Sequence, residues 1–219
     1  MSRHPEQPAN GAYARYGKRT FDLTLALLLL LPALPIFALT GLAVRFALGR
    51  PVLFRQQRPG LDGRPFFLLK FRSMNDSRDK HRQLLPDAER LTTFGRLLRR
   101  SSLDEIPGLW NVIRGEMSFV GPRPLLMRYL ERYDQRQARR HTVRPGITGW
   151  AQVNGRNAVC WHEKLELDVW YSEQLSLALD LRILVRTVAI ACAGHGVSAE
   201  GHATMPEFMG SEGTEGEQR

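Results

Sequence analysis

Two adjacent carboxylates, Asp104 and Glu105, lie between clusters of arginine in the stretch RRSSLDEIPGLWNVIRGEMSFVGPRP, residues 99–124. A carboxylate can attack an electrophile and form a covalent intermediate such as an acyl phosphate, and it can also ligate a hard cation such as Mg²⁺. Both chemistries are helped by nearby guanidinium groups, because a phosphoryl group in transit spreads negative charge over its oxygens. The candidates for that role are Arg99, Arg123 and Arg156.

The same pair also has a purely structural interpretation. Ser102 and Glu105 have the spacing of a capping box, and an acidic residue early in a helix interacts favourably with the helix dipole. Adjacent helical residues face different ways, so two separate roles are expected rather than a shared proton. The sequence has no GxxxxGK[ST] loop and no GxGxxG turn after a strand, so side chains and metal would have to build any nucleotide site.

The length, net charge and cysteine content of the chain limit its class and its possible binding partners. The chain has 219 residues, which suits one domain with a real hydrophobic core. Lys and Arg number 31 and Asp and Glu number 22, and the resulting net charge of +9 favours nucleic acid, an anionic membrane surface or a phosphorylated substrate. Cys160 and Cys192 lack metal-site or CxxC spacing and are expected to be reduced, partly buried thiols in a cytosolic environment.

An uncharged stretch of 22 residues, 23–44, is the strongest structural signal in the chain. As a straight helix it would measure about 33 Å, enough to cross a bilayer core. Pro32 and Pro35 disfavour a straight helix, and Lys and Arg flank both ends, as in cytoplasmic segments. We therefore predict a re-entrant helix that bends at the prolines, with a kinked spanning helix as the alternative. A signal peptide and a buried soluble helix fit less well.

The remaining segments predict an α+β protein that is mainly helical. Residues 1–17 and 211–219 are expected to be flexible, residues 18–50 to form the membrane helix, and residues 51–210 to form a cytosolic catalytic domain. Two apolar strands around the turn signals Pro59-Gly60 and Asp62-Gly63 predict a β-hairpin within residues 51–74. A polar loop or helix is expected at 76–90, followed by a helix at 91–100.

Two basic amphipathic helices are predicted further along the chain. Residues 124–140 and 180–193 carry apolar residues at helical spacing with arginines between them. Such helices can lie in a membrane interface or pack against their own domain, and both alternatives stay open. The apolar positions are Leu126, Tyr129, Leu130 and Tyr133 in the first helix, and Leu181, Leu184, Val185 and Val188 in the second.

Six ordered blocks of the sequence resemble the bacterial sugar transferase family, the monotopic phosphoglycosyl transferases that start glycan assembly on a polyprenyl phosphate. The blocks are FRQQRPG, KFRSM, SLDEIPGLWNV, GEMSFVGPRPLL, RPGITGWAQVNGRN and LELDVWY. The resemblance runs from about residue 18 to residue 210. The ending GVSAEGHATMPEFMG is most similar to members that act in protein glycosylation, which implies UDP-N,N′-diacetylbacillosamine as the donor.

The resemblance implies roles for particular residues. Asp104 matches the nucleophile that attacks the β-phosphorus of a UDP-sugar, releases UMP and holds the phosphosugar. Glu105 matches the second member of the dyad, which either activates the acceptor phosphate or positions the metal. Mg²⁺ is the implied cofactor, with Asp104 as its contact. The residues that match the family's basic positions are Arg123, Arg156 and Arg99, which would bind phosphate, and Lys70, which would orient the dyad.

The resemblance also implies partners and a location. Undecaprenyl phosphate would be the acceptor, and the protein would sit on the cytoplasmic face of the bacterial inner membrane among its lipids, alone or as a homodimer. The family's helix breaks at a Ser-Pro pair; here Pro35 matches the proline, Leu34 replaces the serine and Pro32 is additional. The open alternatives are direct displacement without a covalent intermediate and a non-catalytic membrane adaptor. A nucleic-acid binder rests on charge alone and is disfavoured.

Overall fold

The computed structural model describes residues 11–155, 160–193 and 207–210. Within these residues the chain is mainly helical with two small sheets, which confirms the predicted α+β class. The main helices are α1 (Lys18–Leu48), α3 (Thr93–Arg100), α4 (Gly108–Arg114), α7 (Trp161–Gln174) and α8 (Leu177–Cys192). Shorter helices are α2 (Asp87–Arg90), α5 (Gln135–Ala138) and α6 (Trp150–Asn154). The strands are β1 (Leu53–Pro59), β2 (Pro65–Phe71), β3 (Ser118–Val120) and β4 (Gly146–Thr148).

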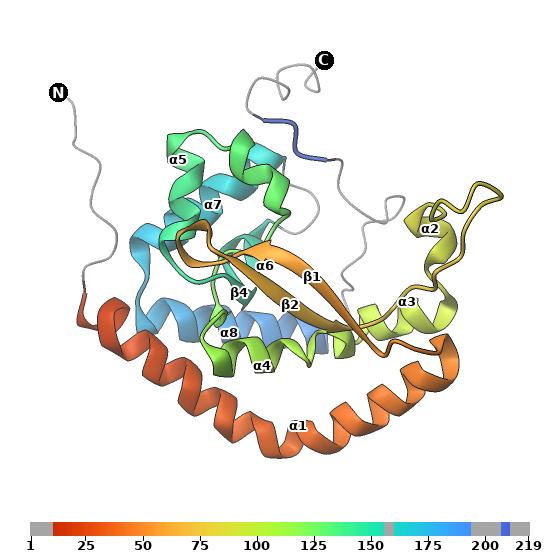
Figure 1. Cartoon of the computed structure of the whole chain (residues 1–219). Helices are drawn as coiled ribbons and strands as arrows, with labels where there is room; N and C mark the ends of the chain where they lie inside the picture. The colour runs from red at the N-terminus through yellow and green to blue at the C-terminus, as the bar shows by residue number, and fades with distance from the viewer. Residues whose placement is uncertain (1–10, 156–159, 194–206, 211–219) are drawn as a thin grey trace.

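Helix α1 has the length and apolar composition that a bilayer crossing requires. It is one continuous helix that contains both Pro32 and Pro35, so the predicted break is a bend without interruption. Figure 1 shows α1 bent near its middle and running beneath the other elements. Proline removes a backbone donor and crowds the preceding turn, which explains a bend at this point. Exposed apolar side chains of the middle section include Leu27, Leu28, Leu31, Leu34, Ile36, Phe37 and Leu39.

Helical structure begins before the predicted boundary at residue 18. Residues Tyr13–Gly17 form a π-helical turn, η1, that leads directly into α1. The Tyr13 hydroxyl donates a hydrogen bond of 2.6 Å to Asp180 on α8, which fixes this turn against the domain. The expected flexible segment therefore does not extend to Tyr13–Gly17. Residues 1–10 and 211–219, which carry the rest of that prediction, lie outside the described residues.

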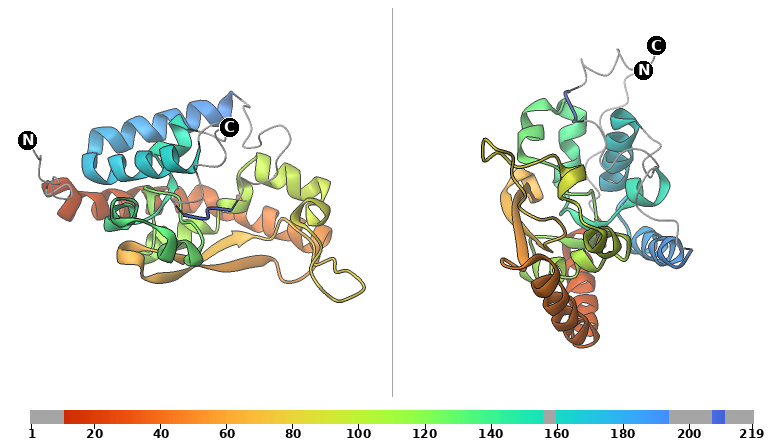
Figure 2. Two further views of the ribbon diagram at one scale, coloured as in Figure 1. Left: turned by 90° about the horizontal axis from the view of Figure 1, so that it is seen from above. Right: turned by 90° about the vertical axis from the view of Figure 1, so that its right-hand side faces the viewer.

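The predicted β-hairpin is confirmed. Strands β1 and β2 pair antiparallel from Leu53 opposite Phe71 to Pro59 opposite Pro65, around a turn at Leu61–Gly63. Asp62 and Gly63 both have positive φ there, as expected for the Asp-Gly turn signal. A second, parallel sheet of β3 and β4 was not predicted, because each strand has only three residues. Seen from above in Figure 2, the hairpin and α8 lie on opposite sides of α1.

The two ends of α1 pack against different parts of the same domain. Ala26, in the N-terminal half, belongs to a core cluster with the inner face of β2, α4, β3 and α8. Val44, in the C-terminal half, packs with Phe71 at the end of β2 and with Leu98 on α3. The hydrophobic core is thus built onto both arms of the bent helix. In the middle, Leu30 and Ala33 also pack against the core, while the outward-facing leucines stay exposed.

The predicted helix over residues 124–140 is wrong. The chain forms three short turns there: η4 (Met127–Arg132), α5 and η5 (Arg139–Thr142). Asp134 explains the interruption, because its side chain caps α5 in a capping box and the residue before it is extended. Tyr129 and Tyr133 pack against Phe208 rather than facing outward. For this segment, packing within the domain replaces the predicted interfacial helix.

Helix α8 confirms the second amphipathic helix, and three of the four residues of its predicted apolar stripe face outward. Leu179 and Ile183 are buried and Leu184 packs against the core, whereas Leu181, Val185 and Val188 are exposed. Arg182 and Arg186 lie over the ring of Trp150, with guanidinium carbons 5.7 and 5.4 Å from its centroid. An apolar stripe beside basic residues therefore remains on the outer surface of α8.

Candidate active site

The Asp104–Glu105 pair lies on a single 3-10 turn, η3 (Leu103–Glu105), between α3 and α4. Ser102 adopts a left-handed conformation with φ of 57° and makes no capping hydrogen bond, so the capping-box interpretation is wrong. A non-glycine residue in this region carries backbone strain, which is typical of sites whose surroundings impose the conformation. The strained corner lets the chain turn sharply and present the two carboxylates to different neighbours.

Glu105 is held by two cations. One of its oxygens, Oε1, accepts a hydrogen bond of 2.5 Å from Lys70 Nζ and one of 3.0 Å from Arg123. Burial by itself would raise the pKa of Glu105, but the charges of Arg123 and Lys70 outweigh it and hold the pKa at about 2. Glu105 is therefore a firmly ionised carboxylate that ties two basic side chains together.

Asp104 has a different environment. Its side chain is buried, with 7% of the residue exposed, and no described residue donates a hydrogen bond to its carboxylate. Burial raises the pKa of Asp104, against the opposing charges of Lys70, Arg99 and Arg123, while the charge of Glu105 adds to the increase. A buried carboxylate that is free of hydrogen bonds and surrounded by cations is a more reactive nucleophile than one fixed in an ion pair.

Lys70 and Arg99 reach the pair from two elements near the C-terminal arm of α1. Lys70 lies near the end of β2, and its strand is tied to α4 because Asn111 accepts from Leu69 N and donates to the Phe67 carbonyl. Arg99 lies in the last turn of α3 and donates a hydrogen bond of 2.9 Å to Ser73 Oγ. Both basic residues that the family resemblance predicted therefore lie close enough for their charges to act on Asp104.

Arg123 approaches from the opposite side, after β3. Its backbone carbonyl accepts a hydrogen bond of 2.7 Å from Arg140, which is itself buried and paired with Asp168 at 2.6 Å. The charge of Glu105 raises the pKa of Arg123. Arg156, the remaining predicted phosphate ligand, lies outside the described residues, so its prediction stays as made.

Two further basic residues near Arg123 were missed in the sequence. Burial and the charge of Arg123 lower the pKa of Arg58 to about 10, and its Nε is buried without a partner among the described residues. Burial and the same charge lower the pKa of Lys164, which lies one turn before Asp168 on α7. Arg58 belongs to the FRQQRPG block, so the block itself was a signal; Lys164 had none beyond its charge.

An apolar cavity lies between Glu105 and the bend in α1. It has a volume of about 380 Å³. Its lining comes from the bend (Leu29, Pro32, Ala33 and Ile36), from the site (Ser102, Glu105, Ile106 and Leu109) and from Phe119 and Ile147. An anionic headgroup with an apolar tail would match this arrangement, because cations lie at one end of the cavity and the exposed apolar middle of α1 lies at the other.

The carboxylates also fit a Mg²⁺ site in which the substrate supplies some of the ligands. Among the described residues there is no cluster of three or more His, Cys, Asp or Glu side chains, so no cage made only of protein ligands is present there. Mg²⁺ usually binds to one or two carboxylates together with substrate phosphates and water. The unbonded carboxylate of Asp104 can serve as such a ligand, whereas Oε1 of Glu105 is already engaged.

Comparison with known proteins identifies similar chains. A family model described as bacterial sugar transferase matches residues 13–194. The uncharacterized sugar transferase EpsL of Bacillus subtilis (strain 168) is 54% identical over 194 residues, which cover 89% of this chain and 96% of that protein. Residues 13–194 include Lys70, Asp104, Glu105 and Arg123, so the matched region contains the described site.

Two longer relatives have more specific names. The undecaprenyl-phosphate glucose phosphotransferase of Komagataeibacter xylinus is 42% identical over 191 residues, or 78% of this chain and 35% of that protein. The UDP-glucose:undecaprenyl-phosphate glucose-1-phosphate transferase of Escherichia coli (strain K12) is 42% identical over 181 residues, or 78% of this chain and 39% of that protein. The chain thus spans less than two fifths of the length of these two relatives.

Proposed function

Because the chain belongs to the bacterial sugar transferase family, we propose that it transfers a sugar 1-phosphate from a UDP-sugar to undecaprenyl phosphate and releases UMP. The observation that carries the proposal is the Asp104 carboxylate, which is buried without a hydrogen-bond donor among the described residues and lies beside three cations. The names of the relatives support the same reaction class. Membership in a transferase family also removes the non-catalytic adaptor from consideration.

In the first half-reaction, an Asp104 oxygen attacks the β-phosphorus of the UDP-sugar. A bond forms between that oxygen and phosphorus, the bond from the β-phosphorus to the bridging oxygen breaks, and UMP leaves with the electron pair. The product is a phosphosugar linked to Asp104 as an acyl phosphate. Arg99, Lys70 and Arg123 are positioned to stabilise the negative charge that spreads over the phosphoryl oxygens in this step.

In the second half-reaction, an oxygen of the polyprenyl phosphate attacks the same phosphorus. The bond to Asp104 breaks, the carboxylate is restored, and the lipid leaves as a diphosphate-linked sugar. The cavity of about 380 Å³ between the dyad and the bend of α1 is suited to the first apolar units of this lipid. Its phosphate would then lie among the cations around Glu105.

The environment of Glu105 favours a positioning role over that of a general base. A base works best when its pKa lies near the operating pH, and the pKa of Glu105 is held at about 2 by Arg123 and Lys70. Its carboxylate instead fixes the two cations at hydrogen-bond distance. Bound Mg²⁺, with Asp104 as its protein ligand, would withdraw charge from the diphosphate.

The pH dependence of the reaction provides one test of the nucleophile. Asp104 must be ionised to attack, so the rate should fall as the pH falls through its raised pKa. Arg99→Met removes a positive charge that lowers this pKa, so the acid limb of kcat/KM should move to higher pH. Arg99→Lys keeps the charge and should leave the limb in place. The measurement is UMP release over a pH series, and an unmoved limb in Arg99→Met would contradict the assignment.

The architecture of α1 supports a monotopic arrangement. Both ends of the helix pack on the same domain, through Ala26 and Val44, whereas its apolar middle is exposed. A spanning helix would place its two ends on opposite sides of the bilayer, which is incompatible with these contacts. We therefore favour a re-entrant helix in the inner membrane with the domain on the cytoplasmic face, and the exposed stripe of α8 is suited to lie at the same interface.

This topology predicts a labelling pattern. Single cysteines at Gly11 and at Arg50, in a chain with Cys160 and Cys192 replaced by serine, should react with an impermeant maleimide from the same side. Both should label in inverted inner-membrane vesicles and neither in intact spheroplasts. Labelling of one site from each side would establish a spanning helix and overturn the re-entrant proposal.

The donor sugar is tested by a panel of UDP-sugars. The resemblance of residues 196–210 to protein-glycosylation members predicts UDP-N,N′-diacetylbacillosamine, although residues 196–206 of that stretch lie outside the described residues. The relatives' names bring UDP-glucose into the same panel. UMP release with undecaprenyl phosphate should be fastest with the N-acetylated amino sugar, by at least about tenfold, the ratio that one net hydrogen bond of about 1.4 kcal/mol supplies.

Each outcome of the panel has a defined meaning. Fastest release with UDP-glucose would replace the proposed sugar and leave the reaction class intact. No UMP release with any donor would overturn the proposed function itself. UMP release from donor alone, before the acceptor is added, favours the covalent intermediate over direct displacement, which requires both substrates at once.

A further inference from the structure

One turn of α1 carries three polar side chains that reach into the domain: Lys18, Arg19 and Asp22. We call this turn the α1 clamp. Lys18 and Asp22 are buried and Arg19 is partly buried, although the helix that carries them has an exposed apolar middle. Buried charges are unfavourable unless they are paired and hydrogen-bonded. The partners of the clamp therefore indicate what it holds in place.

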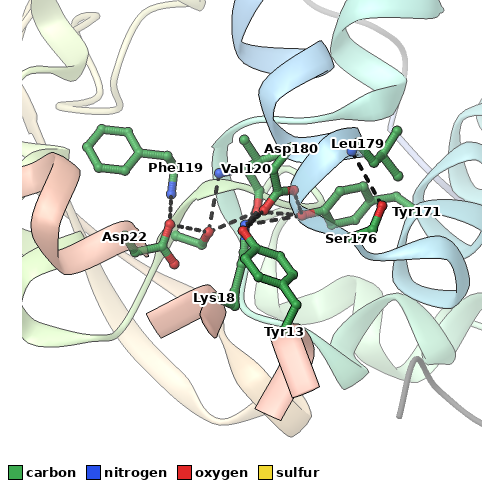
Figure 3. A network of polar contacts seen from close by, with 10 residues as sticks. Tyr13, Lys18, Asp22, Phe119, Val120, Tyr171, Ser176, Leu179 and Asp180 are labelled. Carbon is green, nitrogen blue, oxygen red and sulfur yellow. Dashed lines mark hydrogen bonds and ion pairs between the residues drawn. The ribbon is translucent and has the colours of Figure 1, made fainter. Parts of the chain in front are cut away.

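Lys18 holds the last residue of β3. Its amine lies 2.6 Å from Asp180 Oδ2 on α8, donates a hydrogen bond of 2.9 Å to the Val120 carbonyl and lies 3.2 Å from the Tyr171 hydroxyl. Figure 3 shows Lys18, Tyr13 and Tyr171 converging on Asp180, with the Val120 carbonyl beside them. The ion pair thus ties α1, β3, α7 and α8 together at one point.

Asp22 holds the beginning of the same strand. Its Oδ1 accepts hydrogen bonds of 2.9 Å from Ser118 Oγ and 3.1 Å from Phe119 N. Asp22 lies one turn after Lys18 on α1. The two side chains therefore form hydrogen bonds at opposite ends of the three-residue strand, and Figure 3 shows the contacts at Phe119 and Val120. Strand β3 is therefore fixed along its whole length to the first turn of the membrane helix.

The segment from β3 to the active site has little freedom to adjust. Gly121 donates a hydrogen bond of 2.9 Å to the Thr148 carbonyl, and a Cβ at this position would lie 2.3 Å from the Arg144 carbonyl. Two residues later, Arg123 has its carbonyl bonded to Arg140 and its guanidinium bonded to Glu105. A displacement of β3 would therefore move Arg123.

The third clamp residue, Arg19, holds α4, the helix that follows the dyad. Arg19 donates hydrogen bonds of 2.6 and 2.7 Å to the Val112 and Ile113 carbonyls, in the last turn of α4. A cation at this end also interacts favourably with the helix dipole. Helix α4 begins at Gly108, three residues after Glu105. The hydrogen bonds of Arg19 therefore restrain the helix that directly follows the two carboxylates.

We propose that Lys18 and Arg19, with Asp22, are positioning residues for the transfer reaction: the membrane helix sets the distance between Arg123 and the Asp104–Glu105 pair. The inference rests on the proposed function, because the groups being positioned are those assigned to phosphate transfer. It goes further in giving α1 a direct part in active-site geometry, in addition to attachment to the membrane. A buried ion pair with no such role would affect only folding stability.

The test is a double-mutant cycle in full-length protein in lipid vesicles. Lys18→Met with Asp180→Asn removes both members of the buried ion pair together and leaves an amide oxygen for the two tyrosine hydroxyls, so neither charge of the pair is left without its partner. Asp22 loses the nearby charge of Lys18 but keeps its hydrogen bonds from Ser118 and Phe119. This pair of substitutions should lower kcat/KM by about ten- to a hundredfold, the range expected when a reacting group moves by about 1 Å. Its separate effects on kcat and on KM should match those measured in parallel for Arg123→Ala.

Combination with Arg123→Ala gives the decisive measurement. If the clamp acts through Arg123, adding the clamp pair to Arg123→Ala should lower activity by less than about threefold further, since the positioned group is already gone. Full additivity in a chain that keeps its circular dichroism and melting temperature would overturn the proposal. Arg19→Met is the second variant: it leaves the buried ion pair intact, should lower kcat/KM by about tenfold, and should be non-additive with Glu105→Gln.

Thr20→Val is the matched control. Thr20 lies in the same turn of α1 but is exposed and bonds only to the Tyr16 carbonyl among the described residues, so activity should be unchanged. A loss in Thr20→Val equal to that of the clamp pair would show general damage to the helix and overturn the inference. Because UMP release by the unmodified chain is measured in the same assay, failure of the proposed function would be seen separately.

Discussion

Asp104→Asn should reduce sugar-phosphate transfer by roughly a thousandfold or more, the scale of loss when a nucleophile is removed. Asparagine keeps the size of the side chain but cannot form the acyl phosphate. Because the Asp104 carboxylate accepts no hydrogen bond from a described residue, its replacement should leave the fold intact. The measurements are UMP release with both substrates and mass spectrometry of protein quenched with donor alone.

The covalent adduct distinguishes this result from a general loss of activity. The unmodified chain should gain the mass of the phosphosugar on the peptide that contains Asp104, and Asp104→Asn should gain none. Asp87→Asn serves as the control, because Asp87 is an exposed carboxylate of α2 paired only with Arg90 among the described residues. Robust transfer by Asp104→Asn would refute the nucleophile, and robust transfer without an adduct in the unmodified chain would favour direct displacement.

Arg123→Ala should reduce kcat/KM by about a hundred- to a thousandfold, as found when one charge-stabilising donor is removed from a transition state. The variant removes a cation beside the reacting phosphoryl group and one of the two partners of Glu105. Arg123→Lys should restore little of the lost kcat/KM, because a single ammonium group cannot reproduce the planar, two-pronged hydrogen bonding of a guanidinium group. Steady-state kinetics with varied UDP-sugar would measure the loss.

Arg128→Ala is a matched control for that variant. Arg128 is an exposed arginine five residues further along the chain, and it pairs with Glu207 at 2.8 Å. Exposed ion pairs contribute about 0–1 kcal/mol to stability, so this change should leave activity and melting temperature nearly unaffected. Equal losses in Arg123→Ala and Arg128→Ala would mean that the effect is electrostatic at long range rather than specific to the site.

The parts of the fold with strong local signals could be predicted from the sequence. The uncharged stretch before Val44 gave α1, and the turn signals around Asp62-Gly63 gave the hairpin with its central turn. Helix α3 was predicted from periodicity. Each of these elements depends on neighbouring residues, so the chain itself carries the information.

Elements that depend on distant contacts were not predictable in the same way. Ser102 has capping-box spacing, but Glu105 is drawn instead to Lys70 and Arg123, 35 and 18 residues away in the chain. The apolar residues of the 124–140 segment suggested one helix, whereas Asp134 starts a new one and Phe208 packs on the tyrosines. In both cases a long-range contact outweighs a local pattern.

The grouping of basic residues around the dyad was expected from the family resemblance. Lys70, Arg99 and Arg123 converge on the Asp104–Glu105 pair. Arg58 and Lys164 were missed because an isolated basic residue looks the same whether it is solvated or buried beside another cation. Lys18 was interpreted only as part of a basic flank, since nothing in a sequence reveals that Asp180 lies next to it.

The attachment of both arms of α1 to the domain limits how the protein can be re-engineered. Deleting residues 13–48 to make a water-soluble fragment would leave Asp180 without its lysine and uncover the apolar surfaces that now meet Ala26 and Val44. Substituting an unrelated transmembrane anchor would create the same defects. Solubilisation by redesign should therefore keep the helix and change only the exposed leucines of its middle section.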